Sequence, residues 1–169
     1  MSLSVSMKNS TILYLGIGLV ILIYIILNLD FSKETEVTVV TEVHQLTSKE
    51  FKKIGRNGFD RPAKEDFRKL VVTVTIDHTE NVVNQNIEIP DFKKVINALD
   101  SNTDRHWSEL QANQPGLNTY EYVFLATGLD DRKIRNGFKE QYVKVTLELK
   151  ENEALEELID ISKIMEFKN

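Results

Sequence analysis

The sequence predicts an α+β protein: an N-terminal single transmembrane helix, then a small domain of about five mostly antiparallel strands and two amphipathic helices. Three observations lead to this prediction. An uncharged apolar run occupies Thr11–Leu29, several later segments alternate apolar and polar residues, and two others have apolar residues at helical spacing. A chain of 169 residues, 41% hydrophobic and 28% charged, allows one modest domain plus an appendage.

The apolar run Thr11–Leu29 is predicted to cross a membrane. As a helix it would be about 28 Å long, which matches the hydrocarbon thickness of a bilayer. It is apolar on all sides, which argues against a core helix of a soluble domain. Its length and the lack of an Ala-x-Ala-like site after it indicate an uncleaved signal-anchor. Residues 1–10 then form a short tail carrying Lys8, residues 30–35 form a tether, and residues 36–169 form a domain outside the cytoplasm.

The first strands of that domain are predicted from β-branched residues and period-two alternation. They cover Glu36–Leu46, Leu70–Asp77 and Val82–Ile89. The link His78–Asn81 predicts a hairpin between the second and third strands. In the third strand, one face is expected to hold Val83, Gln85, Ile87 and Ile89.

The rest of the domain alternates between helical and strand patterns. Helices are predicted over Pro90–Asp100 and Asn152–Ile161, and strands over Tyr120–Thr127 and Gln141–Lys150. Between them, Asp104–Gln111 is read as a short helix and Pro115–Gly116 as a turn. The tail Lys163–Phe167 is either a short strand or an extension of the last helix. The expected buried residues of the strands are Val72, Val74, Ile87, Phe124, Val145 and Leu147.

The tetrapeptide Arg-Asn-Gly-Phe occurs twice, at Arg56–Phe59 and at Arg135–Phe138. Each copy is predicted to lie in a connection after one strand and before another. Two explanations remain open. Either residues 36–100 and 120–165 are diverged strand–loop–strand–helix units from a duplication, or the match is a coincidence. In both cases the Asn-Gly pair predicts a tight turn, and each Phe either folds back onto the sheet or projects into solvent.

A basic segment surrounds the first copy. Between Lys49 and Lys69, eight basic residues oppose four acidic ones, giving 8 − 4 = +4 in a chain of net charge −5. Such a segment on an acidic domain is suited to anionic headgroups or an acidic protein partner. The candidate partner-binding residues are therefore Lys52, Lys53, Arg56, Asn57, Phe59, Arg135, Asn136 and Phe138.

The sequence contains no motif that indicates a cofactor, a metal site or catalytic residues. Cysteine is absent, and the three histidines show no metal-ligand spacing. No phosphate-binding loop or nucleophile elbow occurs, and the negative charge argues against nucleic-acid binding. We therefore predict a single-pass, non-enzymatic binding or assembly subunit. It would contact lipid through Thr11–Leu29 and a protein or envelope partner through its domain, with homo-oligomers left open. The alternative is a membrane-tethered enzyme or small-ligand sensor with a pocket near His106 and Trp107.

Overall fold

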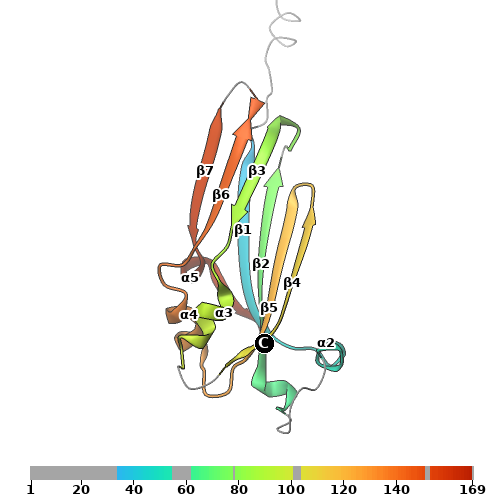
Figure 1. The fold of residues 1–169 in the computed structure, drawn as a ribbon, viewed down its shortest axis with the longest axis vertical. Coiled ribbons are helices and arrows are strands. Elements are labelled where there is room, and N and C mark those ends of the chain that lie inside the picture. Colours follow the sequence, from blue (N-terminus) through green and yellow to red (C-terminus); the bar gives the residue numbers. More distant parts are fainter. Residues whose placement is uncertain (1–33, 55–61, 78, 101–103, 151–152, 169) are drawn as a thin grey trace, which may run out of the picture. The chain divides into compact units, whose positions relative to one another are not determined.

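The computed structural model describes residues 34–54, 62–77, 79–100, 104–150 and 153–168 (Figure 1). Within these residues the protein is α+β, with eight strands in two sheets and a few short helices. The α+β class is confirmed, but the expected number of strands was too low. The predicted membrane helix Thr11–Leu29 lies outside the described residues. Among the residues that the structure does describe, no helix is long and apolar enough to cross a membrane.

The larger sheet has five strands in the order β4-β5-β2-β1-β8. Strand β2 lies at its centre and pairs antiparallel with both β1 and β5, while the short β8 runs parallel to β1. The β4–β5 hairpin closes through the predicted turn at Pro115 and Gly116, although the hairpin itself was not predicted. Gly116 takes φ +72°, which a side chain would disfavour. The bounds are β1 Glu36–Gln45, β2 Phe67–Asp77, β4 His106–Gln114, β5 Leu117–Leu125 and β8 Met165–Lys168.

The smaller sheet has three antiparallel strands in the order β3-β6-β7. Its strands are β3 Val82–Glu88, β6 Tyr142–Leu149 and β7 Ala154–Asp160. The α-helices are all short: α2 Ser48–Lys53, α3 Phe92–Asn97, α4 Asp131–Gly137 and α5 Ile161–Ile164. Two single 3₁₀ turns occupy Lys64–Asp66 and Thr79–Asn81. Helices α3, α4 and α5 gather at one end of the two sheets (Figure 1).

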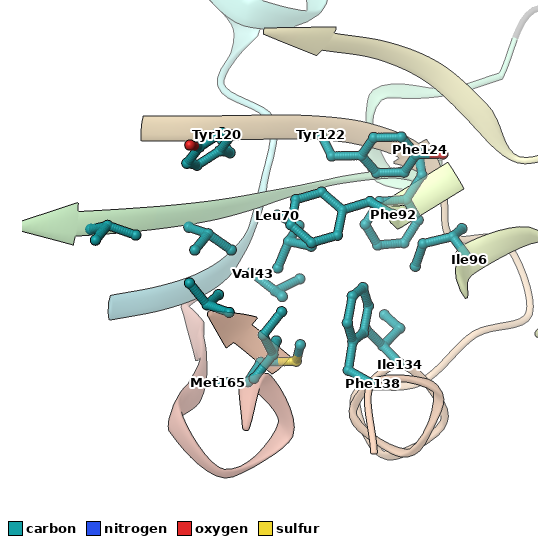
Figure 2. Close-up of a cluster of buried hydrophobic side chains, with 14 of the residues drawn as sticks. Val43, Leu70, Phe92, Ile96, Tyr120, Tyr122, Phe124, Ile134, Phe138 and Met165 are labelled. Atoms are coloured by element: carbon teal, nitrogen blue, oxygen red, sulfur yellow. The ribbon is translucent and has the colours of Figure 1, made fainter. Parts of the chain in front are cut away.

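The main core is built from the facing sides of both sheets and from the helices at their end. Figure 2 shows Tyr122 and Phe92 beside one another, with Ile134 and Phe138 of the α4 region directed toward the same cluster. The Phe92 ring makes edge contacts with the rings of Tyr122 and Phe138. Alternation in the strands explains the burial. The fully or almost fully buried strand residues are Val43, Leu70, Val72, Val74, Ile76, Tyr122, Phe124, Val143, Val145 and Leu147.

The predicted hairpin between the second and third strands is wrong. Strand β2 already has a partner on each side, β1 and β5, so it has no free edge for β3. The turn Thr79–Asn81 instead leads the chain into the other sheet, where β3 pairs with β6. An irregularity between Val82 and Asn84 breaks the strict alternation, which leaves Val83 67% exposed. The predicted shared face of Val83 with Gln85, Ile87 and Ile89 is therefore interrupted at Val83, and Ile87, predicted to be buried, is only half-buried.

Two predicted helices are strands in the structure. The segment predicted as a helix over Asn152–Ile161 forms β7, and only Ile161–Ile164 is helical. Pairing with β6 places Leu155 opposite Leu147, while Leu158 is 58% exposed. The proposed helix around Asp104–Gln111 forms most of β4, because it pairs with β5 across the hairpin. In both cases sheet pairing overrides local helix propensity. The tail forms a strand, β8, which was one of its two predicted states.

Candidate interaction surface

The second Arg-Asn-Gly-Phe copy lies at the end of helix α4, not in an exposed tight turn. Asp130 caps the start of this helix by accepting a hydrogen bond from the backbone N–H of Lys133. Phe138 follows the last helical residue and is fully buried in the main core. The projecting alternative for Phe138 was therefore wrong, and this residue is removed from the candidate partner contacts.

The other residues of this copy bind neighbouring segments of the domain. The Nη1 of Arg135 donates to the carbonyl of Ser162 at 2.9 Å, and its guanidinium lies 5.3 Å from the Phe167 ring centroid. A Cβ added at Gly137 would lie 2.5 Å from a methyl carbon of Leu99, so glycine allows the close approach of this side chain. Asn136 is exposed. The described residues of this copy therefore mainly make packing and hydrogen-bond contacts within the domain.

The first copy, with Arg56, Asn57 and Phe59, lies outside the described residues. The structural equivalence of the two copies and the duplication hypothesis therefore stay predictions.

The basic segment between Lys49 and Lys69 is only partly available for binding. The Lys69 ammonium is almost buried and contacts Glu50 at 2.5 Å and Glu121 at 3.4 Å. Arg68 donates to the backbone carbonyls of Glu65 and Phe67. By contrast, the side chains of Lys49, Lys52 and Lys53 on α2 are exposed. The positive charge that a partner can reach in the described part of this segment is therefore concentrated on α2.

Helix α2 is fixed by a capping box and by a small aromatic cluster. The Thr47 hydroxyl accepts from the backbone N–H of Glu50, whose carboxylate accepts from the backbone N–H of Thr47. Phe51 packs against Phe67, and Phe67 makes an edge contact with Trp107. The complete cluster comprises Leu46, Phe51, Ile54, Phe67, Trp107, Val123 and Leu125.

Helix α2 lies on the outer side of the five-stranded sheet, away from the main core. Phe67, Lys69 and Val71 share one face of β2 because side chains alternate along a strand. Since Phe67 and Lys69 both contact α2, this is the outer face. The exposed lysines of α2 therefore lie on the same side of the sheet as the outward residues of the neighbouring strands.

Beyond α2, the outer side of the sheet exposes apolar and threonine side chains. The strand register places Val40, Thr73, Thr119 and Ala112 in one uncharged row across β1, β2, β5 and β4. One adjacent row adds Val71 and Leu110, with Glu121 of β5 between them, and the other adjacent row adds Leu117. We call the seven uncharged residues the open face. Four of them are exposed: Val40 at 42%, Leu110 at 61%, Leu117 at 39%, and Ala112.

Ion pairs lie along the sides of the open face toward α2 and β8, and one of their carboxylates, Glu121, lies between Val71 and Leu110. Lys69 pairs with Glu50 and Glu121, and Lys168 of β8 pairs with Glu42 and Glu166. Burial alone would lower the pKa of Lys69, but its hydrogen bond to Glu50 and the charge of Glu121 outweigh this and raise it. Burial and the neighbouring Lys69 charge lower the pKa of His44. These charges are therefore largely compensated within the domain.

His106 and Trp107, the residues of the alternative pocket, lie on different faces of the sheet. The His106 ring lies 5.2 Å from the ring of Tyr122, a main-core residue. Trp107 belongs to the outer aromatic cluster, and its Nε1 donates to the Ile54 carbonyl at 2.9 Å. The two side chains therefore do not line one pocket.

Arg105, just before them, is buried and holds the chain in place. Its guanidinium donates to the carbonyls of Leu125 and Thr127 and to the Asp100 carboxylate at 2.8 Å. The polar sequence Asp104–Trp107 thus contributes packing and hydrogen bonds at the start of β4. Sequence reasoning found these residues but could not assign them to opposite faces, because it predicted a helix here.

The described residues contain no group of three or more His, Asp or Glu side chains that could hold a metal ion. No protein-family model, curated protein or solved structure matches the chain. Sequence reasoning missed the open face: Val40, Val71 and Thr73 were within predicted strands, but Leu110 was assigned to a short helix. The missing signal was the pairing of β4 with β5, which places Ala112 in the same row as Thr119 and Thr73.

Proposed function

We propose that this chain is a membrane-anchored, non-enzymatic binding or assembly subunit that contacts a protein partner through the open face. In this proposal Thr11–Leu29 is the membrane anchor, and the domain lies outside the cytoplasm. The exposed lysines Lys49, Lys52 and Lys53 would contribute the charged border of the contact, which favours a partner with acidic groups.

The observation that carries the proposal is the uncharged row Val40–Thr73–Thr119–Ala112 on an exposed sheet face. Its neighbours Leu110 and Leu117 are large apolar residues that remain in contact with water in the free domain. A contiguous apolar patch with a polar rim is typical of a protein-binding surface, and burying it would be favourable.

The outer face of the smaller sheet provides a contrast within the same domain. Strand register places the charged residues Glu88, Lys144, Glu148 and Glu156 on that face, opposite the core residues of β6. Charges spaced in this way are typical of a solvated surface. Tyr142 and Leu158 are also exposed on this face, so the two outer faces differ mainly in the number of charged residues among the apolar ones.

Site-specific cross-linking in intact cells tests the proposal. The chain has no cysteine, so single cysteines can be placed at Thr73 or Thr119 on the open face and at Asn84 on the smaller sheet as the control. A short reagent that joins a thiol to an amine should yield a discrete larger adduct from Thr73→Cys and Thr119→Cys, but not from Asn84→Cys. Adducts only from Asn84→Cys, or none from the open face, would contradict the proposal.

A second arm tests the contribution of α2. Lys52→Glu and Lys53→Glu together should reduce the yield of the Thr73→Cys adduct, and raised salt should reduce it in the unsubstituted background. Both lysines lie in the last turn of α2, where they favour the helix dipole, so thermal melting must accompany the measurement. An unchanged adduct yield in a folded variant would remove these lysines from the contact.

A further inference from the structure

Strand β4 forms an edge of the larger sheet and carries few of the features that normally protect such an edge. It pairs with β5 on one side and has no second strand partner among the described residues, and Figure 1 shows it at the margin of the sheet. After an irregularity between His106 and Ser108, the stretch Ser108–Gln114 pairs regularly and contains no Lys, Arg or Pro. Short length, charge, proline and bulges are the usual protections of edge strands.

The other three edge strands in the described part of the chain are less suited to pairing. Strand β8 spans only Met165–Lys168. Strand β3 is irregular between Val82 and Asn84, which leaves a short regular stretch. Strand β7 carries Glu156, Glu157 and Asp160 without a basic residue, so a second copy of it would bring like charges together. Strand β4 is therefore the edge with the longest regular and nearly uncharged stretch.

The hairpin fixes which backbone groups of β4 are directed outward. Gln114 and Leu117 flank the two-residue loop and pair across it. Such flanking residues form a hydrogen-bonded pair, and hydrogen-bonded and non-hydrogen-bonded pairs alternate from there. The backbone N–H and C=O groups of Glu109, Gln111 and Asn113 are therefore directed away from β5, at the free edge.

We propose that β4 pairs antiparallel with β4 of a second copy of this chain, centred on Leu110. This inference extends the binding surface of the proposed function and rests on the same exposed face. Leu110 is the middle residue of β4 and is 61% exposed. In this register Leu110 faces Leu110 of the second copy. Glu109 of each copy faces Gln111 of the other copy, and the outward backbone groups of these two residues can form hydrogen bonds with each other.

The charges and side chains of β4 are compatible with this self-pairing. Glu109 is the only carboxylate of the strand, and in the Leu110-centred register it does not face its own copy. Within the regular stretch Ser108 faces Ala112, so no like charges meet there. The two open faces become one continuous surface across the new pair, with the leucines at its centre. The proposed membrane anchors would favour pairing further by keeping the copies at high effective concentration.

A pair of cysteine variants of the full-length chain tests the register. Leu110 would form a non-hydrogen-bonded pair with its own copy, with Cα atoms about 4.5 Å apart, which is within disulfide range. Ala112 on the same face would be offset from its own copy by four positions, or about 13 Å, which is too far. Under mild oxidation in gentle detergent, Leu110→Cys should form a linked dimer at least tenfold faster than Ala112→Cys. Equal rates, or no dimer from Leu110→Cys, would overturn the proposal.

A second measurement does not depend on a disulfide. Light scattering should give the mass of a dimer for the unsubstituted chain, corrected for detergent, and of a monomer for Leu110→Lys. Leu158→Lys, an exposed leucine of the smaller sheet, is the matched control and should remain dimeric. An unsubstituted chain that is monomeric at all concentrations would overturn the inference. If Thr73→Cys still forms an adduct with another protein in that case, the proposed function stands and only self-pairing fails.

Discussion

The Nζ of Lys69 lies 2.5 Å from Oε1 of Glu50, and this ion pair fastens helix α2 to the outer side of the five-stranded sheet. The other carboxylate oxygen of Glu50 accepts from the backbone N–H of Thr47 at 2.8 Å. One side chain therefore both caps the helix and neutralises an almost buried ammonium. The hydrogen bond from Lys69 is the main reason that the pKa of Glu50 is lowered to about 2.

Acid should therefore loosen α2 before the rest of the domain. Because the pKa of Glu50 is lower in the folded protein than its ordinary 4.5, its contribution is fully present above about pH 4.5 and is lost as the pH falls toward 2. After allowance for its partial exposure, the contribution is roughly 1–2 kcal/mol. Chemical unfolding of Glu50→Gln should show this loss at pH 7 and a weaker acid dependence between pH 4.5 and 2.

Glu156→Gln provides the matched control for this prediction. Its carboxylate pairs with Lys144 at 3.1 Å, but both side chains are substantially exposed. Such pairs contribute about 0–1 kcal/mol, so this variant should keep the acid dependence of the unsubstituted chain. The same acid profile in Glu50→Gln and Glu156→Gln would contradict the role given to Glu50.

The contact between Gly137 and Leu99 predicts a coupled pair of substitutions. Gly137→Ala would place a Cβ 2.5 Å from Cδ2 of Leu99, which packs against the main core and cannot move freely. We expect a loss of roughly 1–2 kcal/mol, despite the better helix propensity of alanine. In a Leu99→Ala background the same change should be neutral or stabilising. Equal effects in the two backgrounds, measured by thermal unfolding, would contradict the close contact.

Strand register in the smaller sheet can be tested with two aspartates. Val145 is fully buried on β6, whereas Val83 on the adjacent β3 is 67% exposed. Val145→Asp should cost more than about 3 kcal/mol, because it places an unpaired charge in the core. Val83→Asp should change the free energy of unfolding by less than about 0.5 kcal/mol. Similar losses from both variants would mean that the register of this sheet is wrong.

Membrane topology is tested by thiol labelling. Asn84 is exposed on β3, so Asn84→Cys should react with a membrane-impermeant thiol reagent in intact cells if the domain lies outside the cytoplasm. The unsubstituted chain has no cysteine and provides the blank. Labelling that occurs only after lysis would reverse the proposed orientation.

The parts of the fold that the sequence predicted best are those in which local pattern and long-range pairing agree. Alternation identified the buried faces of β2 and β6, and Phe92 and Ile96 of α3 are buried as their helical spacing required. Prediction failed where pairing decided the structure. The spacing of Leu155, Leu158 and Ile159 is typical of a helix, yet this segment pairs with β6 and forms a strand.

The candidate surface was predictable only in part, for the same reason. The excess of lysine between Lys49 and Lys69 was visible in the sequence, but the burial of Lys69 depends on Glu50 and Glu121 from distant segments. For Phe138 the sequence left two alternatives, folding back onto the sheet or projecting into solvent, and it could not decide between them. Predicting the open face requires the pairing of the four strands β4, β5, β2 and β1, which no local sequence pattern provides.

Amide hydrogen exchange at Gln111 tests most directly whether the β4 edge and the open face form an interface. Its N–H is directed away from β5, whereas that of Ala112 is directed toward it. In the full-length chain at high protein concentration, we predict slow exchange at both amides, and exchange at Gln111 at least tenfold faster in Leu110→Lys. Fast exchange at Gln111 in both proteins, with Ala112 protected in both, would show that the edge stays unpaired and would contradict the account.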